Sequence, residues 1–363
     1  MARLRARGGW RVVRPLTILS VAYPFAAVRE DTAGGAEQIL LQLDRAIIDA
    51  GHRSIVVAAH GSAVAGELME TPPLPAPVED SVRAMAHANM AAAIESARRR
   101  FLVDIIHLHG IDFHAYLPRA GVPVLITLHL PLAWYACAAL IPRRPQTWLH
   151  CVSHTQARAA PPGIPLLPVI ENGVDADSFP AGARKRNFAL FLGRICAEKG
   201  VHIAIDAAAR ARVPLLIAGE VFPYPEHTRY FKSEIATRLN RACRFIGRVG
   251  TKPKRWLLAG ARCVLIPSLV EETSSLVARE ALAAGTPVIG FRRGALLDVV
   301  GNGRTGFLVE TVDEMAARIL EADRIDGNLC REEARGRFPL HVTTDKYLRL
   351  YERLVRAPLR AAG

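Results

Sequence analysis

The sequence lacks paired cysteines. Its six cysteines are scattered along 363 residues, and no two of them form a C-x-x-C pair. Several stand in apolar runs, where cysteine usually serves as a small buried residue. This usage fits a reducing cytoplasm and argues against a structural zinc site. The positions are Cys137, Cys151, Cys196, Cys243, Cys263 and Cys330.

Long apolar runs are also missing. No run reaches the roughly 20 residues that a membrane-spanning helix needs. The stretch Met1–Pro15 carries five arginines, and the apolar stretch Leu16–Ala22 that follows is too short for the core of a signal peptide. We therefore expect Leu16–Ala22 to be a buried strand, the arginine-rich start to be a tail, and the protein to be cytoplasmic.

Several functional signatures are absent as well. No G-x-S-x-G elbow is present, so a Ser-His-Asp hydrolase is unsupported. The formal net charge of +13 favours acidic partners such as phosphorylated small molecules or anionic lipid, although it is also compatible with a solvated arginine-rich surface. Nucleic acid is disfavoured, because the basic residues are spread out and no nucleic-acid-binding signature accompanies them.

What is present is an alternation of short apolar runs with helical patterns. Such strands, separated by helices, predict parallel sheets covered on both faces. Expected strands are 16–22, 54–59, 104–109, 122–129, 148–153 and 166–171, then 188–193, 213–218, 243–247, 263–266, 287–291 and 306–309. Expected helices are 35–50, 81–101, 200–211, 252–259, 276–284, 296–300, 312–322 and 343–356. The Gly- and Pro-rich stretch 62–80 is expected to be a surface loop.

This pattern predicts an α/β protein with two Rossmann-like, doubly wound domains. Residues 1–173, with the C-terminal segment 341–363 crossing back, would form the first domain. Residues 174–340 would form the second, and a hinge is expected around Asn172–Asp175. A ligand cleft is expected where the carboxyl ends of the two sheets face each other.

Two glycine-containing turns stand at expected strand ends. Gly34-Gly35 opens the first helix, where a phosphate can approach backbone N–H groups, although a purely structural turn explains the same glycines. Gly193 is followed by Arg194 and, five residues later, by Lys199. A guanidinium and an ammonium at a strand end can hold phosphate, but two solvated surface cations remain an alternative.

The segment from Pro267 to Ile289 carries the strongest signal. It reads as strand end, polar loop, helix and strand, with Glu272 in the loop and Glu280 on the helix. The start of a helix attracts phosphate, and a carboxylate one turn in can accept two sugar hydroxyls. Two surface carboxylates are the alternative, which the surrounding elements disfavour.

Three histidines lie in or at the ends of first-half strands. His109 and His129 both end strands, so both can face the cleft, although a lone histidine of this kind is more often a hydrogen-bonded structural residue. No carboxylate accompanies them at metal-ligand spacing. Asp175-Ala176-Asp177 looks like a metal-binding D-x-D but follows Asn-Gly-Val, so we interpret it as part of a turn.

In their order along nearly the whole chain, these segments resemble the retaining glycosyltransferases of family 4, which have the GT-B fold. The matching segments are Gly34-Gly35-Ala36-Glu37, Thr127-Leu128-His129, Glu171-Asn172-Gly173-Val174-Asp175, Gly193-Arg194, Glu198-Lys199-Gly200, Glu272 through Glu280, Gly285 through Ile289 and Gly303 through Val309.

The resemblance implies a nucleoside diphosphate sugar as donor, with no cofactor and no metal. Arg194 and Lys199 would bind the diphosphate, Glu280 the ribose, and Glu272 the transferred sugar. His129 would lie near the reacting sugar. The other donor-binding positions would be Gly34, Gly35, Val249 or its neighbour Arg248, Ser275 and Leu276.

The chain departs from the family at two places. Many members have Gly-Phe-Gly-Leu after the first glutamate, where this chain has Thr273-Ser274-Ser275-Leu276, so the donor sugar stays open. Asp298 stands where glutamate is usual. The expected activity is metal-independent transfer of a sugar, with retention, to a hydroxyl of a glycan, lipid or small molecule.

Two other classes of function remain open from the residues alone. One is a sugar-nucleotide epimerase on a similar scaffold. The other is a non-catalytic protein that binds a sugar nucleotide or nucleic acid. A peripheral contact with an anionic membrane, at its inner face, is a further expectation from the arginine-rich start.

Overall fold

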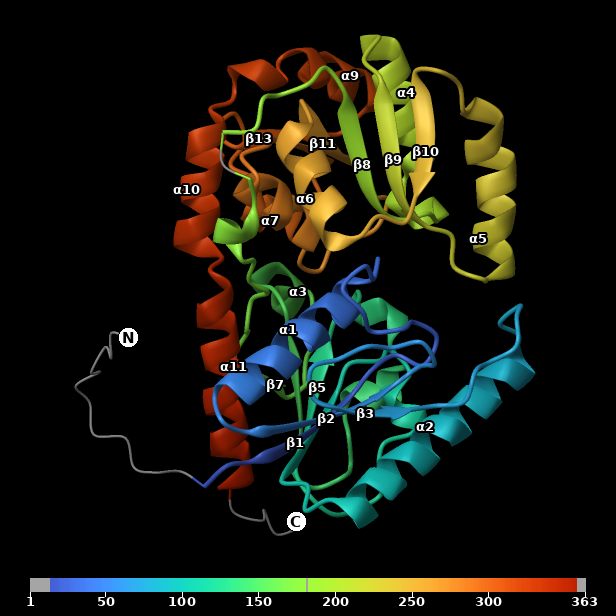
Figure 1. The fold of residues 1–363 in the computed structure, drawn as a ribbon, viewed down its shortest axis with the longest axis vertical. Helices are drawn as coiled ribbons and strands as arrows, with labels where there is room; N and C mark the ends of the chain where they lie inside the picture. Colours follow the sequence, from blue (N-terminus) through green and yellow to red (C-terminus); the bar gives the residue numbers. More distant parts are fainter. Residues whose placement is uncertain (1–13, 181, 358–363) are drawn as a thin grey trace, which may run out of the picture.

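A computed structural model describes residues 14–180 and 182–357. Two α/β domains lie one above the other, each built on its own sheet (Figure 1). Nearly all of the arginine-rich start, and the last six residues, lie outside the described residues. The predicted fold class, a GT-B arrangement of two Rossmann-like domains, is confirmed.

The first domain has a seven-stranded sheet in the order β3-β2-β1-β4-β5-β6-β7. All of its neighbouring strands run parallel, as expected for apolar strands joined by helices. The strands are β1 (Thr17–Val21), β2 (Arg53–Ala58), β3 (Glu67–Glu70), β4 (Ile105–Leu108), β5 (Val124–Leu128), β6 (Thr147–Cys151) and β7 (Leu166–Leu167). The helices are α1 (Gly35–Asp49), α2 (Asp80–Arg100) and α3 (His154–Arg158).

The second domain has a six-stranded parallel sheet in the order β10-β9-β8-β11-β12-β13. Its strands are β8 (Ala189–Arg194), β9 (Leu215–Glu220), β10 (Cys243–Gly247), β11 (Cys263–Ile266), β12 (Val288–Phe291) and β13 (Gly306–Val309). Its helices are α4 (Val201–Ala211), α5 (Pro225–Tyr230), α6 (Thr251–Gly260), α7 (Leu276–Ala283), α8 (Leu296–Val299), α9 (Val312–Leu320) and α10 (Gly327–Arg337). A short 3-10 helix, Ala197–Lys199, follows β8.

The last helix, α11 (Leu340–Val355), leaves the second domain and runs along the first (Figure 1). Its Tyr347 and Tyr351 are fully buried. The hydroxyl of Tyr351 hydrogen-bonds Nδ1 of His107 in β4 at 2.7 Å. This helix therefore completes the core of the first domain with residues from the end of the chain.

Three features differ from the sequence-based expectations. The stretch 62–80, expected to be a loop, contains the edge strand β3, whose residues Glu67–Glu70 are only partly buried and so lack an apolar run. The short helices α3 and α5 and the polar α10 were not predicted. α10 has few buried residues, so its periodicity is weak. Conversely, the strand expected at 166–171 has only two residues in β7.

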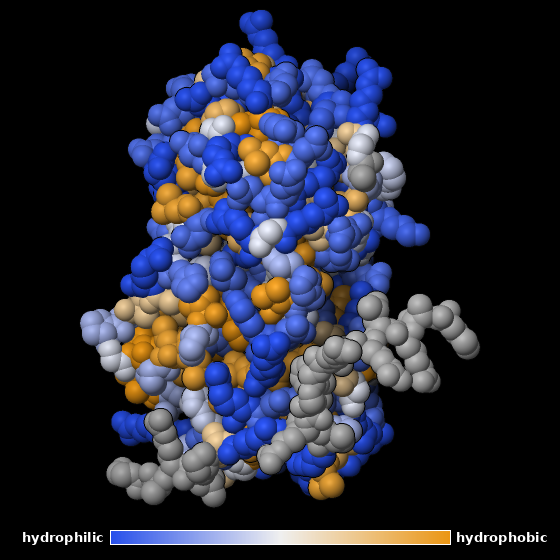
Figure 2. Space-filling model, turned by 90° about the vertical axis from the view of Figure 1, so that its left-hand side faces the viewer, coloured by the Kyte–Doolittle hydropathy of each residue, from blue (hydrophilic) through white to orange (hydrophobic). Residues whose placement is uncertain are grey.

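Among the described residues, no helix is both long enough and apolar enough to cross a membrane. The face that carries α10 and α11 is mostly hydrophilic, with apolar residues interspersed (Figure 2).

Candidate functional site

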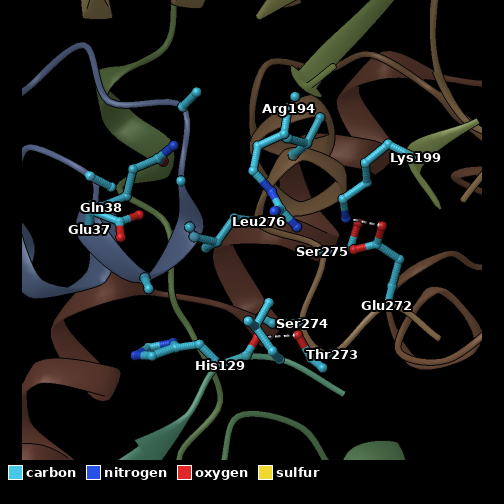
Figure 3. A pocket seen from close by; sticks show the side chains of 18 of the residues that line it. Glu37, Gln38, His129, Arg194, Lys199, Glu272, Thr273, Ser274, Ser275 and Leu276 are labelled. Carbon is cyan, nitrogen blue, oxygen red and sulfur yellow. Dashed lines mark hydrogen bonds and ion pairs between the residues drawn. The ribbon is translucent and has the colours of Figure 1, made fainter. Parts of the chain in front are cut away.

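A cavity of about 410 Å³ lies between the domains, where the carboxyl ends of the two sheets meet. The first domain contributes the start of α1 and the ends of β4 and β5 to its lining. The second domain contributes the end of β8, the segment before α5, and the loop that leads into α7. Figure 3 shows side chains of both domains around the opening, with Glu37, Gln38 and His129 from the first domain and Arg194, Lys199 and Glu272 from the second. The cleft predicted from the strand pattern is present.

Arg194 and Lys199 both line this cavity, at the end of β8 and in the turn behind it. Gly200 makes that turn with a φ of +67°, and a Cβ on it would lie 2.1 Å from the carbonyl oxygen of Pro267. Only glycine avoids both the strained backbone and the clash. Among the described residues, the guanidinium of Arg194 has no carboxylate partner, so it remains available to an anion.

Glu272 stands opposite Lys199 (Figure 3), and its Oε1 accepts a hydrogen bond from Lys199 Nζ at 2.6 Å. The Ser268 hydroxyl donates to the same oxygen. Burial alone would raise the pKa of Glu272, but Lys199 and Ser268 outweigh it and hold the pKa below its ordinary value. Glu272 is therefore a buried, ionised carboxylate in the cavity wall.

The loop after Glu272 approaches the cavity with an unusual backbone. Ser275, the residue before α7, has a φ of +51°, a left-handed conformation that is uncommon outside glycine. The Ser274 hydroxyl is buried without a hydrogen-bond partner among the described residues. From Leu276 onward, the first turn of α7 leaves backbone N–H groups without helical partners. The loop presents free donors toward the cavity.

Glu280 lies one turn into α7 and lines a smaller hollow of about 30 Å³, whose lining overlaps that of the main cavity. Its Oε1 accepts from Lys254 Nζ at 2.6 Å, whereas its Oε2 is buried and unpaired among the described residues. Val249 and Arg248 line the same hollow. A free carboxylate oxygen here suits a ligand that donates hydroxyl hydrogens.

From the opposite domain, Gly34 and Gly35 border the cavity at the start of α1. A Cβ on Gly35 would lie 3.4 Å from Cδ1 of Leu276, so the two domains come within contact distance at this point. Glu37, in the first turn of α1, is buried, and burial raises its pKa. Its carboxyl is turned toward the cavity (Figure 3).

His109 and His129 both reach the cavity, as their positions at strand ends predicted. Their rings pair through Nδ1 of His109 and Nε2 of His129 at 3.0 Å, and burial lowers the pKa of His129 to about 3. The backbone carbonyl of His129 accepts from the Thr273 hydroxyl at 2.7 Å, which joins the two domains (Figure 3). His107 points elsewhere, into the contact with α11.

Sequence reasoning missed several residues of the site. Lys254, beside Glu280, was not singled out, because a lysine in a helix gives no signal of its partner. Tyr23 and Tyr224, which also line the cavity, join the two domains through their hydroxyls at 2.7 Å. Asp177 lies away from the cavity and pairs with Arg335 on the surface, as a turn residue would.

Comparison with known proteins places these features in a family. Residues 175–332 match the glycosyl transferases group 1, and residues 33–178 match glycosyltransferase family 4. A glycogen synthase of Mycobacterium tuberculosis is 30% identical over 257 residues, which cover 61% of each chain and so less than two thirds of that relative. A phosphatidyl-myo-inositol mannosyltransferase of Mycobacterium leprae is 26% identical and matches 89% of this chain and 94% of its own length.

Solved structures show the same fold at low identity. The sucrose-phosphate synthase of Thermosynechococcus elongatus superposes with a TM-score of 0.75 at 18% identity, over 94% of this chain and 100% of its own. The Anabaena protein HepE, solved in complex with UDP-glucose, has a TM-score of 0.70 at 18% identity, over 93% of this chain and 100% of its own. With two family matches that together span both domains, the chain belongs to the group 1, family 4 glycosyltransferases.

Proposed function

We propose that this protein transfers a glycosyl group, with retention of configuration, from a nucleoside diphosphate sugar to a hydroxyl of an acceptor. The acceptor would be a glycan, a lipid or a small molecule. The observation that carries the proposal is that an unpaired guanidinium, Arg194, and an ionised carboxylate, Glu272, line one cavity, while the free oxygen of Glu280 lines the hollow that adjoins it. These three groups match the diphosphate, the sugar and the ribose of one extended donor. The bound UDP-glucose of HepE supports a donor of this class.

The chemistry assigned to each group follows from charge. The bond from the sugar C1 to the phosphate oxygen breaks, and negative charge grows on the diphosphate. Arg194, Lys199 and the start of α7 stabilise that charge without a metal ion bridging the phosphates. Glu280 accepts from the ribose hydroxyls through Oε2, while Lys254 holds Oε1. Gly34, Gly35 and Leu276 let the two domains close near the phosphates.

We further propose attack from the same face that the leaving group occupies. The acceptor oxygen bonds to C1, and its proton passes to the leaving phosphate oxygen. Glu272 is held by Lys199 and Ser268, so it serves sugar hydroxyls better than it would serve as a nucleophile. His129, next to His109, would sit beside the reacting sugar.

The test is a product analysis. A thermal-shift screen of nucleoside diphosphate sugars identifies a donor, because a bound ligand raises the melting temperature by mass action. The coupling constant of the anomeric proton in the product, measured by NMR, then reports configuration. Inversion would overturn retention, and a changed sugar nucleotide without acceptor would indicate an epimerase. A rate unchanged by added Mg²⁺ after chelation is expected.

Location is proposed separately. We infer a cytoplasmic protein that touches anionic membrane at its periphery, on the strength of its net charge of +13. Cosedimentation with anionic vesicles should exceed that with neutral vesicles at low salt. Equal cosedimentation would contradict it. Salt-dependent binding of random DNA, without binding of any sugar nucleotide, would instead favour a nucleic-acid binder.

A further inference from the structure

Three side chains of metal-binding type lie together beside the donor half of the cleft. The cysteine sulfur of Cys196, a carboxylate oxygen of Glu198 and a ring nitrogen of His227 are all within 4.8 Å of one another. Cys196 and Glu198 come from the turn after β8, and His227 comes from α5. The described residues contain no other group of three or more such side chains at this spacing.

Burial makes this cluster more than a chance surface grouping. Cys196 is fully buried, and His227 is only 7% exposed. Nδ1 of His227 is buried and has no hydrogen-bond partner among the described residues. Buried polar atoms in proteins are nearly always paired, so an unpaired ring nitrogen inside such a cluster calls for a ligand.

The charged groups near the cluster include the Glu198 carboxylate and two cations, Arg194 and Lys199. Lys199 lies next to Glu198 in the chain, but its ammonium is taken by Glu272 at 2.6 Å. Among the described residues, Glu198 has no ion-pair partner. The sulfur of Cys196 lies 3.9 Å from the carbonyl oxygen of Arg194 and also contacts the Glu198 carboxylate. A bound cation would neutralise the carboxylate and a thiolate together.

We propose that Cys196, Glu198 and His227 bind a divalent transition-metal ion of the zinc class. Sulfur and imidazole ligands select zinc over the hard cations Mg²⁺ and Ca²⁺, and three protein ligands with one water complete a tetrahedron. Ligand atoms around tetrahedral zinc lie about 3.5 Å apart, given bond lengths of 2.0–2.3 Å. The ligand atoms, which lie within 4.8 Å of one another, would therefore have to approach by at most about 1.3 Å on metal binding.

This site is separate from the diphosphate position. Cys196 and Glu198 are not part of the cavity lining, and of the three ligands only His227 borders the cavity. The ion would fasten the turn after β8 to α5. That helix follows Tyr224, whose ring lies 5.1 Å from that of His227 and whose hydroxyl contacts Tyr23 of the first domain. Metal binding would thus brace the contact that joins the domains, and it does not require the proposed transfer reaction.

The experiment uses Co²⁺ and Zn²⁺ with the full chain, reduced and freed of metal. Co²⁺ should bind at one equivalent per chain and give the near-ultraviolet charge-transfer band of a thiolate–cobalt bond, and Zn²⁺ should abolish the band. Cys196→Ser should remove the band, and His227→Gln should weaken Co²⁺ binding at least about 100-fold, since loss of a mere supporting contact costs 10–100-fold. Zn²⁺ should also raise the melting temperature of the wild type but of neither variant.

Matched controls separate this site from other thiols and histidines. Cys137→Ser removes an exposed thiol, and His114→Gln removes an exposed imidazole. Both variants should bind Co²⁺ as the wild type does. If Cys196→Ser fails to fold, the proposal is tested by Co²⁺ binding to His227→Gln and by the charge-transfer band of the wild type. Absence of the band, or equal binding by the wild type and His227→Gln, would overturn the proposal.

Discussion

Arg279, in α7 of the second domain, donates a hydrogen bond from Nη1 to the backbone carbonyl of Asn172 at 2.6 Å. Nη2 of the same guanidinium reaches Glu171 at 3.1 Å, and its carbon lies 4.1 Å from the centre of the Phe338 ring. Asn172 lies where the chain leaves the first domain, and Phe338 where it returns. One fully buried arginine therefore holds both crossings of the chain between the domains.

Arg279→Ala should lower the free energy of unfolding by about 3 kcal/mol, because it leaves a carbonyl and a carboxylate without their buried partner. Urea denaturation measures the change. Arg335→Ala, which removes an exposed pair with Asp177, should cost less than about 1 kcal/mol. Equal losses of unfolding free energy in the two variants would show that the contacts of Arg279 between the domains contribute no more to stability than an exposed ion pair does.

Arg194→Ala should reduce kcat by about 10²–10³-fold, because the main group that stabilises charge on the departing diphosphate is lost. The melting temperature should stay close to that of the wild type, since Arg194 has no ion-pair partner among the described residues. Arg241→Ala, on an exposed residue of the same domain, is the control. Near-normal turnover by the Arg194 variant would remove that residue from the phosphate site.

Glu280→Gln should weaken binding of a nucleoside diphosphate by about 1.5–3 kcal/mol, roughly 10–150-fold, through the lost charged acceptor for ribose hydroxyls. Calorimetry with inorganic pyrophosphate supplies the control, because this ligand has no ribose and should bind both proteins comparably. A parallel loss for pyrophosphate would mean that Glu280 shapes the phosphate site instead.

Stability should fall as pH drops from about 6.5 to about 4. Burial lowers the pKa of His150 to about 4 and that of His129 to about 3. In the unfolded chain these histidines take up protons near their ordinary pKa of 6.5, so the unfolded state binds more protons in this window. Within this window each histidine contributes a slope of up to about 1.4 kcal/mol per pH unit, and above about pH 6.5 its contribution to stability is fully present.

Urea midpoints measured between pH 7 and pH 4.5 give this slope directly. His150→Gln should start from a lower stability, because His150 hydrogen-bonds Thr127 at 2.7 Å, yet show a shallower dependence on pH. An unchanged slope in that variant would place the acid sensitivity in other groups.

Ser275→Gly should stabilise the fold by up to about 1 kcal/mol, since a left-handed residue other than glycine carries a strain of about 1–2 kcal/mol and glycine costs some chain entropy in return. Thermal unfolding provides the measurement. Ser274→Gly, whose neighbour carries the left-handed backbone, serves as the comparison and should not stabilise. If Ser275→Gly destabilises, then the serine hydroxyl, not the backbone, explains the residue.

The sequence alone indicated which segments are strands and helices, because burial imposes a period on apolar residues. It also placed Glu272 and Glu280 around the start of α7, and Arg194 and Lys199 after β8, because each pair lies within one short segment. The edge strand β3 and the polar α10 escaped prediction for the same reason: they bury little and so leave no strong pattern.

Only the tertiary structure decided which distant residues meet. Lys199 pairs with Glu272, and Lys254 with Glu280, although 73 and 26 residues separate the partners. Nothing in the sequence singled out Cys196 among the six cysteines, and folding sets it beside His227. These contacts between residues distant in the sequence depend on how the two sheets and the crossing helix α11 pack together. That arrangement is determined by side-chain packing throughout the fold, and the local spacing of residue types in the sequence does not reveal it.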